Sequence, residues 1–304
     1  MSALTKAERP AKKQAFGGMG DRIMSRTVFC VAVTGIIVLI FILGFLIANG
    51  LLVLKTVSLK EIFFSRDWYP TEEPPALGMA ALIAGTLAAT LLSSIIAIPA
   101  ALALAVFTAE IALRKLRNFF KVLLEMLGFL PSIVLGFIGM MLIAPWMQDT
   151  LGIVSGLNLL NASILLGFLI IPVVASLSDE ALAAVPLELR DASYALGATR
   201  METIQKVVFP SALPGIIASV LLGVMRALGE TMVVLMAAGG AAIIPTLFTE
   251  PVRPLTSTIA AEMGETPVGS VHYYALFFAG LILLVMTLMI NLASLYIEKR
   301  GTKR

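Results

Sequence analysis

The chain has 304 residues, of which 59% are hydrophobic and 13% are charged, and its formal net charge is +3. A soluble domain carries roughly 45–50% apolar and about 25% charged residues, so this composition excludes an ordinary water-soluble protein and indicates a chain embedded in lipid. The single cysteine excludes an internal disulfide framework, and the single histidine excludes a histidine-cluster metal site.

Apolar stretches long enough to cross a bilayer follow a short basic arm at residues 1–21. A membrane-spanning helix needs about 20 such residues. The predicted spans are 28–54, 77–107, 126–147, 157–178, 213–238 and 273–297, within a transmembrane domain of residues 22–300. The sequence therefore predicts an all-α integral membrane protein with six transmembrane helices.

The positions of the Lys and Arg residues predict the orientation of these spans. Seventeen of the 22 fall in the segment before the first span, the loops after the second and fourth spans, and the C-terminal tail, whereas four fall in the loops on the opposite side. Cytoplasmic loops of membrane proteins carry an excess of Lys and Arg. We therefore expect a multi-pass protein with both termini in the cytoplasm.

The loop at 181–214 is the longest charged gap between spans on the predicted cytoplasmic side, and its pattern is helical. Residues 187–196 predict a short helix, and Gly197 then permits a sharp reversal because it has no β-carbon. Thr199 followed by Glu202 is a capping-box pattern, which begins a second short helix. On this pattern alone, two amphipathic helices lying on the membrane surface remain an equally good interpretation.

Residue spacing within this loop is more specific. Asp191, Ala192 and Ser193 are followed after three residues by Gly197, and nine further residues lead to an apolar stretch that ends at Pro210. This order resembles the E-A-A-x3-G-x9-I-x-L-P loop of ABC importer permeases, in which a short helix sits in a groove of the ATPase. The resemblance implies that the first three residues lie on the docking helix, Gly197 at its turn and Pro210 at the exit. We call residues 181–214 the coupling loop.

Two charged residues, Arg226 and Glu230, interrupt the predicted fifth span. Residues four apart share one face of a helix and are close enough to pair. Charges inside a membrane cost about 2.5–3.5 kcal/mol each, and they usually mark a functional site, although a structural salt bridge is the alternative. The planar fork of arginine suits a tetrahedral oxyanion. We therefore predict that Arg226 contacts an anion in the translocation path and that Glu230 tunes this contact.

Four further stretches carry a family resemblance: LGFLPSIVLGFIGMMLIAP (127–145), the region 170–216, MRALGETMVV (225–234) and HYYALFFAGLILLVMTLMIN (272–291). Through them most of the chain resembles the permease subunits of the phosphate-specific ABC importer, and the G-E-T-M sequence favours the PstC type over the paired PstA type. This resemblance implies the type I ABC importer permease fold and a bacterial inner-membrane location. The implied partners are a PstA-type permease, a dimer of PstB-type ATPase subunits and an external PstS-type phosphate-binding protein.

Other classes of function remain open at this point. The sequence lacks a G-x-x-x-x-G-K-[ST] phosphate-binding loop, so we expect a transport subunit without enzyme activity or a cofactor of its own, with ATP bound by the partner ATPase and no nucleic-acid partner. A permease for sulfate or molybdate, or a membrane sensor or scaffold in phosphate signalling, is an alternative. A membrane phosphatase or lipid transferase is disfavoured because the lone His272 and Cys30 offer no catalytic cluster.

Overall fold

The computed structural model describes secondary structure for residues 19–301 and side chains for residues 23–297. The chain divides into two units, Met1–Leu46 and Ile47–Arg304. Helix α1 (Met19–Gly50) provides the described part of the first unit, and its 32 residues extend over about 48 Å.

The second unit is almost entirely helical. Its short strands β1 and β2 form an antiparallel pair in which Trp68 is opposite Leu77. The π-helical turns Gly139–Ile143 and Ile204–Val208 join α-helices without a break, whereas the π-helical turn Phe107–Ile111 ends the helix that begins with α3, and Ala112 after it is extended. The elements follow in the order α2 (Leu59–Phe64), β1 (Trp68–Tyr69), β2 (Ala76–Leu77), α3 (Ala80–Val106), α4 (Arg114–Gly128), α5 (Ser132–Ile138), α6 (Ala144–Leu151), α7 (Leu159–Ala183), α8 (Leu187–Ala195), α9 (Arg200–Thr203), α10 (Phe209–Leu228), α11 (Met232–Ala237), α12 (Leu255–Glu262) and α13 (Val271–Gly301).

Six helical segments in the described part of the chain are long and apolar enough to cross a membrane. This number agrees with the six spans that the sequence predicts. Residues 1–18 of the predicted basic arm lie outside the described residues, and the rest of the arm belongs to α1. The six segments are Ile23–Lys55, Ala80–Ile111, Ser132–Leu151, Leu159–Ala183, Arg200–Leu228 and Val271–Ile297.

The third span differs from the predicted 126–147 because it begins only at Ser132. The residues before it form α4, an amphipathic helix that carries four basic residues and packs against α7. The chain then leaves the helical conformation, and Pro131 is the residue before the first turn of α5. Proline disfavours a helical conformation at the residue that precedes it, here Leu130, which explains the break.

The fifth span also differs from the predicted 213–238. Its helix begins at Arg200 and ends at Leu228, and α11 is a separate short helix. Gly229 follows the last helical residue, where its lack of a side chain weakens helix propagation. Arg226 therefore lies in the last turn of the span and Glu230 lies beyond it, which corrects the expectation that both sit on one continuous helix.

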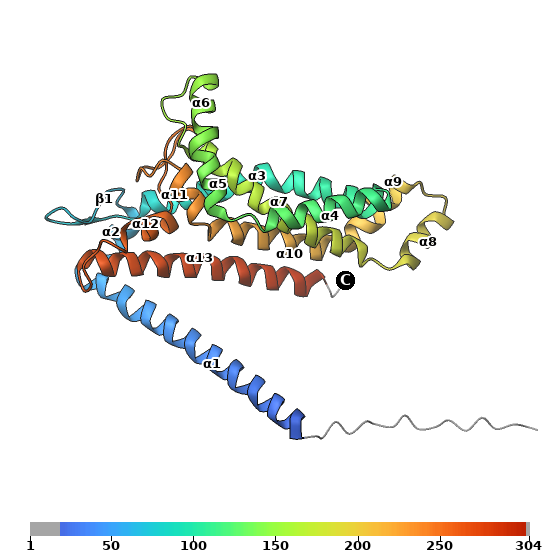
Figure 1. Cartoon of the computed structure of the whole chain (residues 1–304), viewed down its shortest axis with the longest axis horizontal. Helices are drawn as coiled ribbons and strands as arrows, with labels where there is room; N and C mark the ends of the chain where they lie inside the picture. The colour runs from blue at the N-terminus through green and yellow to red at the C-terminus, as the bar shows by residue number, and fades with distance from the viewer. Residues whose placement is uncertain (1–18, 302–304) are drawn as a thin grey trace, which may run out of the picture. The chain divides into compact units, whose positions relative to one another are not determined.

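Helix α7 is the centre of the second unit, with α3 and α10 packed along it (Figure 1). Small residues bring α10 close to α7, since a β-carbon at Gly223 would lie 2.4 Å from Cγ2 of Val174. A buried hydrogen bond of 2.6 Å joins the hydroxyls of Ser178 and Ser219 across the same interface. Close backbone approach and interhelical hydrogen bonds are typical of helix packing in membranes, where lipid removes the hydrophobic drive between helices.

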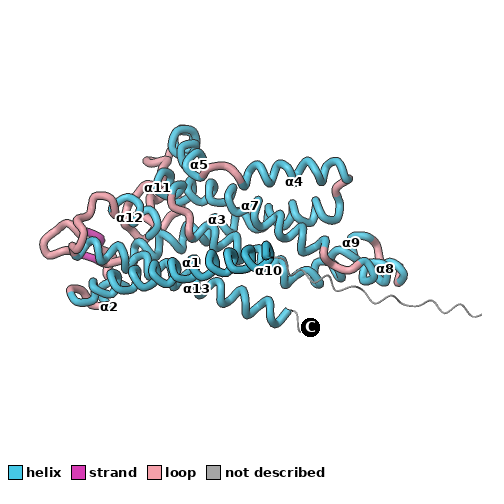
Figure 2. Tube along the Cα trace, turned by 60° about the horizontal axis from the view of Figure 1, so that its bottom comes forward, coloured by secondary structure: helices cyan, strands magenta, loops and turns pink. Residues whose placement is uncertain are grey.

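The second unit has two distinct ends. Figures 1 and 2 both place α8 and α9 at one end of the long helices, and the β1–β2 hairpin and α12 at the other. We call these the loop end and the strand end. The coupling loop is therefore separated from the strand pair by the length of the spans, in agreement with the alternation of loops read from the sequence.

Candidate functional site

The short helix predicted at residues 187–196 is present as α8 at the loop end. One side of this helix is anchored, because the buried Ser193 hydroxyl lies 2.9 Å from the hydroxyl of Thr203 in α9. Asp191 and Ala192 are exposed, and Leu196 beside the helix end is 90% exposed. The helix therefore presents an acidic residue and small or apolar side chains to a partner while its other side is held by the loop.

The turn after α8 has the geometry that the sequence predicts. Gly197 has a φ of +83°, in the left-handed region that favours glycine. The Ala198 N–H donates to the Ser193 carbonyl oxygen at 3.2 Å, a bond typical of a helix that ends at such a glycine. Thr199 and Glu202 then form the predicted capping box, with both reciprocal bonds present. The local sequence thus determines where α8 ends and where the next helix begins.

The second helix of the coupling loop is not a separate short element. Arg200 begins a helix that passes through the π-helical turn Ile204–Val208 and continues into α10. Pro210 lies just after the π-helical turn, whose wider hydrogen-bond pattern accommodates the proline inside a continuous helix. The expected exit from the loop is therefore a position within one long helix, so a displacement of α9 moves the fifth span directly.

Arg226 and Glu230 pair, although the helix ends between them. Arg226 Nη1 lies 2.5 Å from Glu230 Oε2, and the side chains are 43% and 4% exposed. The other carboxylate oxygen of Glu230 accepts the N–H groups of Met232 at 3.2 Å and Val233 at 3.5 Å at the start of α11. The carboxylate is therefore fixed by the backbone on one side, and the guanidinium leaves much of its fork open to a ligand.

The short non-helical segment between α10 and α11, which contains Glu230, is hydrogen-bonded to α12. The Thr256 hydroxyl donates to the backbone carbonyl oxygen of Glu230 at 2.7 Å. Sequence spacing identifies the Arg226–Glu230 pair but misses Thr256, because a single buried threonine 26 residues away carries no pattern. The Thr256 hydroxyl, which helps to fix the backbone of Glu230, is therefore identified only by the tertiary structure.

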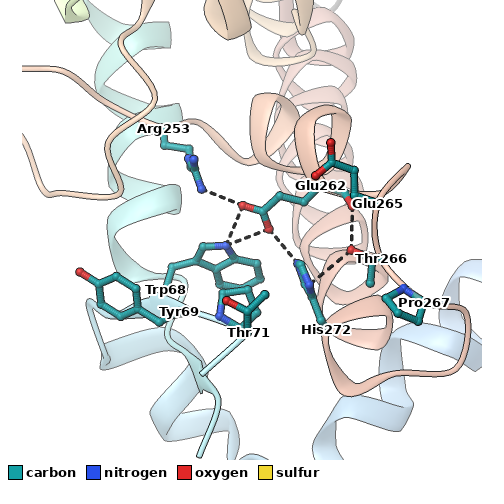
Figure 3. Close-up of a pocket in the computed structure, with 10 residues that line it drawn as sticks. Trp68, Tyr69, Thr71, Arg253, Glu262, Glu265, Thr266, Pro267 and His272 are labelled. Atoms are coloured by element: carbon teal, nitrogen blue, oxygen red, sulfur yellow. Dashed lines mark hydrogen bonds and ion pairs between the residues drawn. The ribbon is translucent and has the colours of Figure 1, made fainter. Parts of the chain in front are cut away.

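A second polar cluster lies at the strand end, and no residue pattern in the sequence indicates it. Glu262, the last residue of α12, lies 2.7 Å from Arg253 Nη1 and 2.8 Å from His272 Nε2. Its carboxylate also accepts the indole N–H of Trp68 at 3.1 Å. Figure 3 shows these side chains converging on the carboxylate beside a cavity of about 370 Å³, which Glu265 also lines. One carboxylate therefore joins the hairpin, the 239–254 segment and the start of α13.

Glu262→Gln is expected to loosen the β1–β2 hairpin while leaving the spans intact. Hydrogen bonds to charged groups contribute about 1.5–3 kcal/mol each, and the amide keeps the shape of the side chain without its charge. We expect faster amide hydrogen exchange at residues 68–77 in the purified complex. The matched control is Glu265→Gln, which lies beside the same cavity, and equal exchange rates in both variants would contradict a bracing role for Glu262.

Comparison with known proteins places these features in a family. The model of the family described as binding-protein-dependent transport system inner membrane component matches residues 97–303. The chain belongs to this family. Its members are inner-membrane transport subunits, so the chain is a multi-pass inner-membrane protein that works with a binding protein and an ATPase.

Named relatives cover most of the chain. It is 38% identical over 244 residues to the probable ABC transporter permease protein YqgH of Bacillus subtilis, which covers 80% of this chain and 79% of that protein. It is 32% identical over 255 residues to the phosphate transport system permease protein PstC of Mesorhizobium japonicum, covering 78% and 77% of the two chains. The resemblance to PstC-type permeases is therefore confirmed.

A solved structure shares the fold. A chain of the bacterial alginate ABC transporter, crystallised with an alginate-bound periplasmic protein, superposes with a TM-score of 0.64 at 15% identity. The match covers 93% of this chain and 98% of that chain. At this identity the likeness concerns the fold alone, and it confirms the type I ABC importer permease fold.

Proposed function

We propose that this chain is one permease subunit of an ATP-driven importer for inorganic phosphate and forms half of its translocation path. The observation that carries the proposal is α8, a short helix at the loop end with Asp191 and Ala192 exposed, followed by the left-handed Gly197. This is the form expected of a helix that docks into an ATPase. Similarity to PstC proteins over most of the chain supports phosphate as the substrate.

In this proposal, the coupling loop faces the cytoplasm and receives motion from the ATPase. Asp191, Ala192 and Ser193 lie on the docking helix, with Ser193 as its anchor to α9. Because α9 continues without interruption into α10, a push on the loop reaches the fifth span. The excess of Lys and Arg on the same side supports a cytoplasmic position for both termini.

Arg226 and Glu230 provide the anion contact in the path. The guanidinium is 43% exposed and uses Nη1 for Glu230, which leaves other N–H groups for phosphate oxygens. Arginine binds such oxyanions through parallel charge-assisted hydrogen bonds. Glu230, fixed by the start of α11, neutralises the guanidinium when no anion is present and limits how tightly an anion is held.

The partners of this chain follow from the same proposal. A PstA-type permease completes the path, two PstB-type ATPase subunits bind and hydrolyse ATP, and a PstS-type protein delivers phosphate from outside. The similarity to PstC proteins supports these specific partners. This chain then needs no cofactor of its own.

The proposal is tested by reconstituting the purified complex with its binding protein in vesicles and measuring ATP-dependent uptake of labelled phosphate. Unlabelled sulfate and molybdate are the competitors. We expect competition by phosphate alone. Uptake that sulfate or molybdate suppresses as strongly as phosphate would assign another oxyanion. A complex that assembles and hydrolyses ATP but moves none of the three would contradict a transport role and favour a sensor.

A further inference from the structure

A buried carboxylate outside the coupling loop is held by the loop's arginines. Glu110, at the end of the second span, is 8% exposed in its side chain, and Arg190 of α8 is 16% exposed. Arg190 Nη1 lies 2.7 and 2.8 Å from the two carboxylate oxygens of Glu110. Eighty residues separate the two partners, so no sequence spacing indicates their contact.

The same arginines bind the ends of two spans. Arg190 Nη2 donates to the carbonyl oxygen of Leu182 at 2.8 Å, next to the last residue of α7. Arg200, at the start of α9, donates to the backbone carbonyl oxygen of Glu110. The last carbonyl groups of a helix lack partners within the helix, and positive charge near them is favourable. The arginines therefore satisfy carbonyl groups at the ends of the second and fourth spans while pairing with Glu110.

We propose that Glu110, Arg190 and Arg200 are positioning residues that make the coupling loop move as one body with the ends of the second and fourth spans. This inference rests on the proposed coupling of α8 to an ATPase. Without these contacts, α8 is joined to the spans by the chain on either side of it, by the Ser193–Thr203 hydrogen bond and by packing against α9 and the π-helical turn Ile204–Val208, all on the fifth span. With them, motion delivered at α8 reaches the second, fourth and fifth spans together.

A second buried carboxylate, Asp179, serves as a control for Glu110, because its ion-pair partners lie on α4 and not in the coupling loop. Asp179 of α7 has a side chain that is 3% exposed and lies 2.9 Å from Lys121 and 3.3 Å from Arg117, both on α4. It pairs one span with an amphipathic helix rather than with α8. Asp179→Asn therefore removes the two ion pairs of a buried carboxylate close to the end of α7 without removing a partner of Arg190.

The experiment uses the intact complex with its ATPase subunits and binding protein. Glu110→Gln, Arg190→Gln and the double variant are reconstituted, and labelled phosphate uptake is divided by ATP hydrolysed in the same vesicles. We expect this ratio to fall about fivefold or more in each single variant, the lower end of typical coupling between linked sites. The double variant should fall no further than Arg190→Gln alone, since the Glu110 side chain acts through its contact with Arg190. Asp179→Asn should keep the wild-type ratio.

The ratio of phosphate uptake to ATP hydrolysed distinguishes a positioning role from a purely structural one, because only loss of positioning lowers uptake for each ATP hydrolysed by an assembled complex. A wild-type ratio in the assembled Glu110 and Arg190 variants would overturn the inference, and so would an equal fall in Asp179→Asn. If the glutamine variants do not assemble, Arg190→Lys takes their place, because a single ammonium group does not reproduce the two-nitrogen contact with Glu110 and Leu182. A wild-type ratio in that variant also overturns the inference. Failure of the proposed function itself would instead show as a wild-type complex that moves no phosphate.

Discussion

Arg226→Gln is expected to lower ATP-dependent phosphate uptake about tenfold or more at saturating binding protein. A hydrogen bond to a charged group contributes about 1.5–3 kcal/mol, and 1.4 kcal/mol corresponds to a factor of ten. Glutamine removes the charge and the fork that the open guanidinium offers to an anion. Arg226→Lys keeps the charge without the fork and should give an intermediate rate.

Glu230→Gln separates tuning from a structural role. The glutamine side-chain oxygen can still accept the N–H groups of Met232 and Val233, so the start of α11 stays capped. Arg226 then has no counter-charge and holds the anion longer, which lowers the maximal rate. The measurement is uptake by vesicles that contain equal amounts of assembled complex. Wild-type uptake by both glutamine variants would leave the pair only a structural role.

Gly197→Val is expected to abolish most coupling to the ATPase while the subunit still inserts into the membrane. A residue with a β-carbon at the left-handed φ of +83° is strained by roughly 1–2 kcal/mol, and more for a β-branched side chain. A penalty of this size shifts a local equilibrium about 5- to 30-fold away from the native turn. We expect co-purification of the ATPase and phosphate uptake to fall together.

Gly152 provides the matched control for this substitution. It has a φ of +64° at the end of α6, and neither it nor Gly197 has a heavy atom within 4 Å of the position of an added β-carbon. Gly152→Val therefore introduces a comparable strain outside the coupling loop. ATPase association equal to wild type in both variants, or lost equally in both, would refute the special role of Gly197.

The coupling loop was the part of the site most accessible from the sequence. The end of α8 at Gly197 and the capping box of Thr199 with Glu202 depend on contacts among residues a few positions apart. Such local hydrogen bonds leave a signature in residue order. What the order did not show is that the second loop helix continues into α10, because the π-helical turn at Ile204–Val208 accommodates the following proline.

The Arg226–Glu230 pair was predictable as a pair, because two charges in an apolar stretch stand out. Its location was not. In the predicted fifth span both residues lie on one helix, whereas in the structure the helix ends at Leu228 and Glu230 binds the first amides of α11. Hydropathy indicates the length of an apolar segment, but it does not reveal a short interruption of the helix within that segment.

Composition, hydropathy and the spacing around Gly197 by themselves determined that the chain is a helical membrane protein with six spans and a coupling-loop pattern. Only the tertiary structure decided which carboxylates the arginines reach: Glu110 for Arg190, and Glu262 for Arg253. The physical reason is the separation along the chain of the residues that interact. Lipid solvation and helix-end hydrogen bonds act on neighbouring residues, whereas the buried Glu110–Arg190 pair depends on helix packing that brings residues 80 positions apart within 3 Å.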